Sequence, residues 1–193
     1  MDDSTKLNLV TWVGSVRKGS HNAAVARSLS ALAPEGVAIG LLPSVAELPI
    51  YDADIQEAGF PESVTALGRA IKAADGLIIV TPEYNYSIPG GLKNAIDWVS
   101  RLPDKPIAGK PVLIQSASIG IFGGARAQYH LRQVLVFVDA YPMNVPEVMV
   151  GQAQAKIAGD PPELRDKATR DFIGGQLAKF ARFVRQRQAG ATL

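Results

Sequence analysis

The chain has 193 residues, 47% of them hydrophobic and 20% charged, which is typical of a single globular domain over residues 1–193. Twenty Lys and Arg against 18 Asp and Glu give a net charge of +2, too small and scattered for nucleic-acid binding. The chain has no cysteine, which excludes disulfides, thiolate metal sites and a cysteine nucleophile. It has only two histidines, so we expect no metal site.

The sequence also predicts a soluble, cytoplasmic protein that does not enter a membrane. No apolar run approaches the length needed to span a bilayer. The chain begins with Met1-Asp2-Asp3-Ser4, which is acidic, whereas a secretory signal peptide begins with a basic segment.

Short apolar runs alternate with amphipathic segments along the whole chain. In chain order we predict a strand over 7–13, a helix from Asn22 to Pro34, a strand over 37–42, a long loop over 43–60, a helix over 61–74, a strand over 76–80, a helix over 92–100, a strand over 111–115, a helix over 125–140, a strand around 143–146 and a helical stretch over about 162–188.

This alternation predicts a parallel sheet with helices on both faces. Five strands in a chain of this length suit the flavodoxin-like, doubly wound α/β fold with strand order 2-1-3-4-5. Such sheets bind ligands beyond the carboxyl ends of their strands. We therefore expect the site in the loops over 14–22, 81–91 and 116–124.

The loop over 14–22 joins an apolar strand to the start of a helix, where unpaired backbone N–H groups and the helix dipole favour an anion. Ser15, Ser20 and Asn22 add short polar side chains, and Arg17 can bind an oxyanion through two N–H groups. The alternative is an ordinary turn in which Asn22 or Ser20 only caps the helix.

The same loop lacks the motifs of the commonest nucleotide sites. It is not G-x-G-x-x-G, and Ser20 stands where a P-loop carries its lysine, although Gly14 and Gly19 have the P-loop spacing. A terminal phosphomonoester therefore fits the loop better than a nucleoside triphosphate.

The loop over 81–91 contains two prolines and two tyrosines, Tyr84 and Tyr86. A stiff aromatic loop beside an anion site suits a planar ring attached to a phosphate, with backbone amides near Glu83 and Asn85 as fixed donors. The alternative is that the tyrosines only pack against the next helix. For Glu83 we favour an anchoring or interface role over that of a catalytic acid.

Several segments together resemble a known family, the NADPH-dependent FMN reductases, and within it the bacterial chromate reductase/quinone reductase branch. The resemblance spans the first strand to about Glu147. It is carried by Gly14-Ser15-x-Arg17-x-x-Ser20-x-Asn22, Thr81-Pro82-Glu83-Tyr84-Asn85, Pro89-Gly90-Gly91-Leu92-Lys93-Asn94-Ala95-Ile96-Asp97-Trp98, Gly109-Lys110-Pro111-Val112, Gly123-Gly124-Ala125-Arg126 and Leu131-Arg132.

The resemblance implies a flavodoxin-like fold, bound FMN, NADPH or NADH as co-substrate, and quinones, azo dyes or chromate as small-molecule electron acceptors. A hydride would pass to flavin N5, and the electrons would pass on to the acceptor. The cofactor-binding residues that it implies are Ser15, Arg17, Ser20 and Asn22 at the phosphate, Pro82, Glu83, Tyr84 and Asn85 along the ring, and Ser116, Ser118 and Gly120 near its pyrimidine end.

No catalytic acid or base stands out, because the flavin carries the chemistry. Tyr84, Asn85 and Arg101 are our candidates for positioning the substrate. The residues do not decide between NADH and NADPH.

The resemblance further implies a homo-oligomer, either a dimer or a homotetramer. Arg126 and Tyr129 share one face of the predicted helix over 125–140, and Glu147 is a candidate partner for Arg126. This helix is apolar nearly all round, which suits either an oligomer interface or a helix buried in the core of one chain.

Two other functions stay open. The first is a flavodoxin-like electron carrier without turnover of its own, although such carriers are commonly acidic and this chain is not. The second is a module that binds a phosphorylated ligand other than a flavin.

Overall fold

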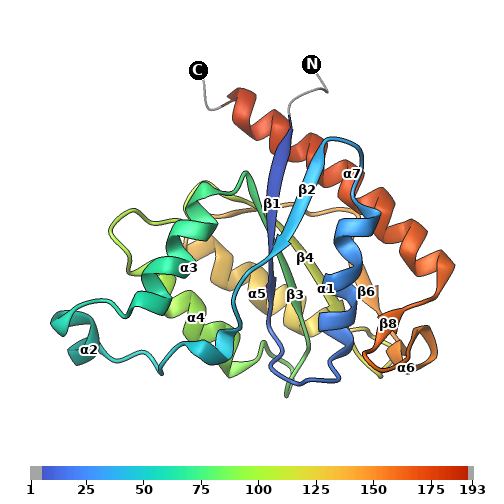
Figure 1. The fold of residues 1–193 in the computed structure, drawn as a ribbon, viewed down its shortest axis with the longest axis horizontal. Helices are drawn as coiled ribbons and strands as arrows, with labels where there is room; N and C mark the ends of the chain where they lie inside the picture. The colour runs from blue at the N-terminus through green and yellow to red at the C-terminus, as the bar shows by residue number, and fades with distance from the viewer. Residues whose placement is uncertain (1–5, 191–193) are drawn as a thin grey trace.

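The computed structural model describes residues 6–190, so the acidic start of the chain lies outside the described residues (Figure 1). A parallel sheet runs through the centre in the order β2-β1-β3-β4-β5, with β6 also paired to β4, which confirms the doubly wound fold. Its strands are β1 (Leu7–Val13), β2 (Val37–Leu41), β3 (Gly76–Thr81), β4 (Pro111–Ala117), β5 (Tyr141–Pro142) and β6 (Val148–Val150).

Helices cover both faces of the sheet, as the alternating pattern predicts. The helices are α1 (His21–Leu32), α2 (Ala53–Ala58), α3 (Glu62–Ala73), α4 (Gly90–Ser100), α5 (Ala125–Phe137), α6 (Ala153–Lys156) and α7 (Lys167–Gly190), with a 3₁₀ turn, η1 (Val45–Glu47). Helices α1 and α7 pack on one face, and α3, α4 and α5 pack on the other. Strands β3 and β4 are buried along their whole length for this reason.

Successive residues of β3 serve the two faces in turn. Ile78 and Val80 belong to the core beneath α1 and α7, and Leu77 and Ile79 belong to the core beneath α3, α4 and α5. This alternation fixes the register of the sheet, because a shift by one residue would exchange the two cores.

The predicted fifth strand is divided. Strand β5 pairs with the beginning of β4 and β6 pairs with its end, while residues 143–147 run between them. The expected strand around 143–146 therefore falls on the connecting segment. Pro146 lies in this segment and has no N–H for a ladder hydrogen bond, which explains why the strand does not continue through it.

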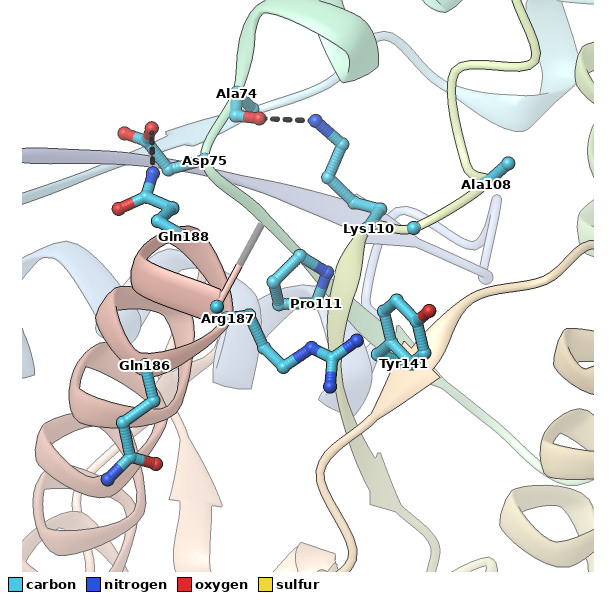
Figure 2. A pocket seen from close by; sticks show the side chains of 11 residues that line it. Ala74, Asp75, Ala108, Lys110, Pro111, Tyr141, Gln186, Arg187 and Gln188 are labelled. Carbon is cyan, nitrogen blue, oxygen red and sulfur yellow. Dashed lines mark hydrogen bonds between the residues drawn. The ribbon is translucent and has the colours of Figure 1, made fainter. Parts of the chain in front are cut away.

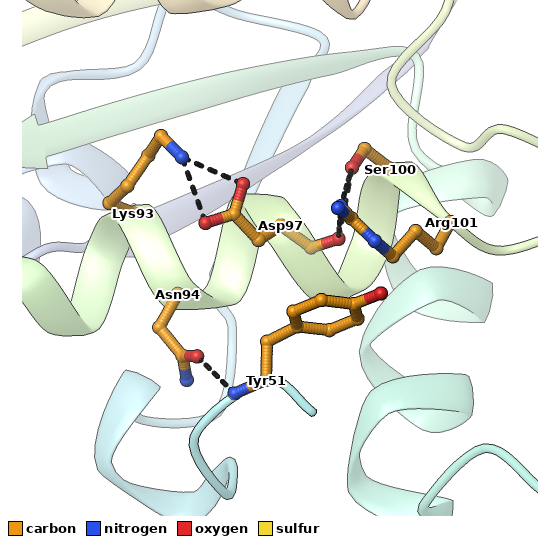
Figure 3. Close-up of polar contacts among 6 residues, drawn as sticks. All are labelled: Tyr51, Lys93, Asn94, Asp97, Ser100 and Arg101. Atoms are coloured by element: carbon orange, nitrogen blue, oxygen red, sulfur yellow. Dashed lines mark hydrogen bonds and ion pairs between the residues drawn. The ribbon is translucent and has the colours of Figure 1, made fainter. Parts of the chain in front are cut away.

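The segment over 43–60, predicted as a loop, contains η1 and α2 and is fastened to α4 (Figure 3). Asn94 accepts a hydrogen bond from the Tyr51 backbone N–H at 2.7 Å and donates one to the Pro49 carbonyl at 2.8 Å. The indole N–H of Trp98 donates to the same carbonyl at 2.8 Å. These contacts hold the segment over the outer surface of α4.

The C-terminal region contains a further element that the periodicity did not predict. Two-residue strands β7 (Ile157–Ala158) and β8 (Glu163–Leu164) form an antiparallel hairpin before α7 begins. Among the helices over residues 6–190, none is long and apolar enough to cross a membrane.

Candidate functional site

The loops that follow β1, β3 and β4 lie together, because these three strands are parallel neighbours in the sheet. The Gly14 backbone N–H donates to the Val80 carbonyl at 2.9 Å. A Cβ at Gly14 would lie only 2.6 Å from Thr81 Oγ1, so the first loop needs glycine at this close approach. The carboxyl edge of the sheet thus brings the three predicted loops into one region.

The loop after β1 ends at the first turn of α1 and has the groups of an anion site. Ser20 is the N-cap of α1, and its Oγ accepts the Ala23 N–H at 3.2 Å. The backbone N–H groups of Val16, Lys18 and Gly19 have no acceptor among the described residues. An oxyanion at this turn would meet these donors and the positive end of the helix dipole.

Arg17 and Ser15 complete this loop. The Arg17 guanidinium is exposed, and within residues 6–190 it has no carboxylate or carbonyl partner. It therefore keeps its full set of donors for a ligand. The Ser15 hydroxyl accepts the Arg17 N–H at 3.4 Å and retains its own proton to donate.

Asn22 is used differently from what the resemblance implies. Its Nδ2 donates to the Ala117 carbonyl at 2.9 Å, and its Oδ1 accepts the Ala117 N–H at 2.8 Å. The side chain is buried and fastens the start of α1 to the end of β4. Asn22 thus holds the anion loop in place, and its carboxamide is already paired in this structure.

The loop after β3 folds back as a tight hairpin. The N–H and carbonyl groups of Tyr84 bond to those of Ser87 at 2.9 and 3.0 Å, and Asn85 and Tyr86 between them have φ of 50° and 67°. These angles are those of a type I′ turn. Tyr84 and Tyr86 are exposed, so the tyrosines do not simply pack against the next helix.

The same hairpin is anchored to α5. Glu83 Oε2 accepts the Ala127 N–H at 3.1 Å in the first turn of α5, and its Oε1 lies 3.4 Å from Arg126. Ser87 Oγ lies 2.7 Å from His130 Nδ1. The Glu83 carboxylate therefore has the anchoring role that we favoured, while the backbone N–H groups of Glu83, Asn85 and Tyr86 have no acceptor within the described part of the chain.

The three residues predicted at the end of β4 and in the loop after it, Ser116, Ser118 and Gly120, differ in their exposure. Ser116 is fully buried, and its hydroxyl donates to the Gly123 carbonyl at 2.6 Å, so the side chain points into the protein. Ser118 is half-buried and its Oγ accepts the Gly120 N–H at 3.2 Å. Of the three residues, Ser118 and Gly120 lie where a ligand could meet them.

Exposed apolar side chains gather on these three loops. A surface of this kind commonly marks a ligand or partner site, because isolated proteins rarely expose contiguous apolar patches. Its members are Val16 from the first loop, Tyr84 and Tyr86 from the second, and Ile119, Ile121 and Phe122 from the third.

Arg101 does not join this region (Figure 3). It follows the last turn of α4, and a helix of 11 residues is about 16 Å long, so Arg101 lies at the far end of α4 from the hairpin. Its guanidinium stacks 4.0 Å above the Tyr51 ring and donates to the Asp97 carbonyl at 2.8 Å. The structure therefore gives Arg101 a role in holding the segment over 43–60, away from the site.

Two cavities lie at the opposite, amino edge of the sheet. One, of about 570 Å³, is bordered by Lys110, Pro111, Tyr141 and Arg187 (Figure 2), and the other, of about 620 Å³, is bordered by Lys6 and Arg182. Burial lowers the pKa of Lys110, whose Nζ donates to the Ala74 carbonyl. Neither cavity includes a residue of the three loops.

The residues expected at an oligomer interface are paired within the chain. Arg126 lies against Glu83 and stacks on the rings of Tyr86 and Phe122 at 4.2 and 4.6 Å. Glu147 accepts a hydrogen bond from the Tyr129 hydroxyl at 3.2 Å, and its other carboxylate oxygen lies 3.7 Å from Arg132. The expected pair of Glu147 with Arg126 is not present among these contacts.

Sequence reasoning did not single out Gln128, which is fully buried beside the third loop. It included Gly123 and Gly124 in a family motif but did not predict their left-handed conformations, with φ of 60° and 92°. The consecutive glycines before the predicted helix were a usable signal for a left-handed turn. A glutamine within a helix has no comparable signal, because only the packing shows that it faces inward.

The fold and these loops define a class of protein: a doubly wound α/β protein in which three loops, with backbone amides left unpaired within the described residues, meet at the carboxyl edge of the sheet, where such folds bind their ligands. The chain belongs to the NADPH-dependent FMN reductase family, whose sequence profile matches residues 7–155. This confirms the family expected from the motifs. The protein is thus an oxidoreductase with FMN as cofactor and NAD(P)H as reductant.

Individual relatives match over nearly the whole chain. The chain is 58% identical over 184 residues to a quinone reductase of Escherichia coli K12, which covers 95% of this chain and 98% of the relative. It is 48% identical over 173 residues to an NAD(P)H-dependent FMN reductase of Pseudomonas aeruginosa, and the match covers 90% of this chain and 92% of that relative.

Solved structures agree with this assignment. The flavoenzyme NAD(P)H:(acceptor) oxidoreductase FerB of Paracoccus denitrificans superposes with a TM-score of 0.83 at 34% identity, covering 94% of this chain and 98% of FerB. A Pseudomonas aeruginosa flavodoxin superposes with a TM-score of 0.56 at 14% identity, which shows the shared fold alone.

Proposed function

We propose that the protein, as a single flavin-binding domain over residues 1–193, reduces quinones with NADH or NADPH and reduces chromate as one of several further acceptors. The observation that supports this most is the anion loop at the start of α1. It combines unpaired amides, the Ser15 hydroxyl and an Arg17 without a partner among the described residues. The quinone reductases among its relatives give the acceptor class.

Each loop has a separate task in this proposal. Ser15, Arg17 and the amides before α1 bind the phosphate of FMN. The amides of Glu83 and Asn85, and those of Ile119 and Ile121 in the loop that contains Ser118 and Gly120, are free within residues 6–190 and donate hydrogen bonds to the edge of the ring. Pro82 would help to hold the ring, and Tyr84 and Asn85 would position the acceptor. The chemistry supplied by bound FMN is acceptance of a hydride at N5 and onward transfer of the electrons to the acceptor.

In this proposal the protein residues bind and orient the reactants, and no residue is assigned the role of an acid or a base. The hairpin is suited to this because Glu83 and Ser87 fasten it to α5 at two points. A hairpin fixed in this way keeps its free amides in place before the ring binds, and such preorganisation lowers the cost of binding.

We further propose a cytoplasmic homo-oligomer, a dimer or a tetramer, in which the exposed apolar loops are covered. The exposed end of α5, including Val136 and Phe137, adds to the apolar surface that a second copy could cover. Arg126, Tyr129 and Glu147 lie on or beside this helix and are our candidate interface residues.

Steady-state oxidation of NADPH by the purified protein tests the enzymatic proposal. With a soluble benzoquinone as acceptor, we expect many turnovers per protein without any added partner protein. An electron carrier without turnover of its own would not oxidise NADPH at an appreciable rate until a partner reductase were added. Protein that shows no flavin and no turnover would instead support a module for another phosphorylated ligand.

A further inference from the structure

A fully buried glutamine, Gln128, lies directly behind the loop that follows β4. Its Nε2 donates to Ser116 Oγ at 2.7 Å and to the Val148 carbonyl at 2.8 Å. Both partners lie on adjacent strands of the sheet, β4 and β6. Both bonds come from Nε2, while the buried Oε1 has no hydrogen-bond partner among residues 6–190. The two donated bonds therefore hold this side chain in its orientation.

The hydrogen bonds continue from Gln128 into the loop. Ser116 Oγ, which accepts from Gln128, donates its own proton to the Gly123 carbonyl at 2.6 Å. A chain of two hydrogen bonds thus links α5 through β4 to the turn at residues 120–124. Because a hydroxyl that accepts one hydrogen bond donates the next more strongly, the two bonds reinforce each other.

The turn that receives this bond has little freedom to move. Gly123 and Gly124 are in left-handed conformations, and a Cβ at these positions would lie within 2.8 Å of Met149 or Ser116. The Gly123 N–H donates to the Gly120 carbonyl, and that carbonyl also accepts the Gln152 N–H. These contacts leave the N–H groups of Ile119 and Ile121 without an acceptor among residues 6–190.

We infer that Gln128 is a positioning residue for the flavin site, acting through Ser116 to hold the 118–124 loop and its free amides in the geometry that binds the ring edge. This inference rests on the proposed function for its flavin part. The control of the loop by Gln128 is a separate physical claim that cofactor-free protein can test.

The first experiment measures amide hydrogen exchange of residues 118–124 in cofactor-free protein. Gln128→Met keeps the volume but removes both hydrogen bonds, and Ser116→Ala removes the middle of the chain. Gln176→Met is the matched control, because Gln176 is equally buried and bonds to Gln115 at 2.8 Å and to the Pro146 carbonyl at 2.6 Å. We expect exchange in 118–124 to rise about tenfold in the first two variants and to stay unchanged in the control.

The second experiment measures FMN dissociation and the visible circular dichroism of the flavin in the same variants. We expect Gln128→Met and Ser116→Ala to release FMN about tenfold faster and to change the flavin dichroism in the same way. The double variant is expected to be no worse than the more affected single variant, because both act through one chain of bonds.

Several results would overturn the inference. Unchanged exchange in 118–124 of Gln128→Met, with stability lowered as in Gln176→Met, would make Gln128 an ordinary core residue. Additive effects in the double variant would remove the connection through Ser116. If Gln128→Met does not fold, Ser116→Ala decides the matter. If no variant and no wild-type protein binds FMN, the proposed function fails, and the exchange experiment still decides whether Gln128 controls the loop.

Discussion

Asn22 and the backbone of Ala117 form a reciprocal pair of hydrogen bonds, 2.9 Å from Nδ2 to the carbonyl and 2.8 Å from the N–H to Oδ1. The pair joins the first turn of α1 to the last residue of β4, so the anion loop and the loop after β4 are held in a fixed relation. The site is therefore built on hydrogen bonds between elements that are 95 residues apart in the chain.

Replacing Asn22 tests this relation. Asn22→Ala leaves the buried N–H and carbonyl of Ala117 unpaired, so we expect the free energy of unfolding of cofactor-free protein to fall by about 2–4 kcal/mol. Urea denaturation measures it. Unchanged stability together with weaker FMN binding would instead show that Asn22 contacts the phosphate, as the motif alone implies.

Arg17→Ala tests the anion loop. Loss of a charge-assisted contact to the phosphate weakens FMN binding by about 1.5–3 kcal/mol, or roughly 10- to 100-fold in Kd. Fluorescence titration of FMN measures the change. Lys18→Ala is the control, since Lys18 is an exposed cation next to Arg17 and is not expected to contact the phosphate. Equal losses in the two variants would mean that general charge, and not the Arg17 contact, attracts FMN.

Gly14→Ala tests the close approach of the first two loops. The added Cβ would lie 2.6 Å from the buried Thr81 Oγ1, and we expect a destabilisation of about 1–3 kcal/mol from the forced shift. Gly40→Ala is the control in the neighbouring strand, where a Cβ meets nothing within 4 Å. Denaturation curves compare the two. Similar stabilities for both variants would contradict the close approach.

Acid should weaken the start of α7. Hydrogen bonds from the Thr169 hydroxyl and backbone N–H to Asp166 lower the pKa of that carboxyl group. A carboxylate whose pKa is lowered by folding stabilises the fold at a pH above its ordinary pKa of about 3.9. This stabilisation is lost as the pH falls through the lower pKa of the folded state.

Asp166→Asn retains a capping side chain but not the charge. We expect wild-type protein to melt at a higher temperature than this variant near neutral pH, and the difference to disappear as the pH falls below about 3.9. A difference that stays constant over this range would show that the Asp166 charge does not stabilise α7.

Much of this architecture could be predicted from the sequence. The apolar run at 76–80 predicted a strand covered on both faces, and β3 is buried throughout, because parallel strands between two helix layers must be apolar on both sides. The strand order alone was enough to predict that the three loops lie together at one edge of the sheet. The division of the last strand did not, since it depends on how residues 143–147 pack beside β4.

The side chains of the site were less predictable than its loops. Asn22, Ser116 and Arg101 have the residue types of ligand contacts, yet they bond to Ala117, Gly123 and Asp97. A motif fixes the position of a residue in the chain, but the direction of its side chain depends on the neighbours that the fold supplies. The exposure of Arg17 and the burial of Gln128 likewise depend on how the chain folds, and the sequence alone does not give them.

The most direct test of the account is the visible absorption spectrum of freshly purified protein, followed by release and identification of any pigment. We expect a flavin spectrum that yields FMN on heating and bleaches when NADPH is added without oxygen. Protein that is colourless, and that stays colourless after incubation with FMN and removal of the excess, would contradict the account.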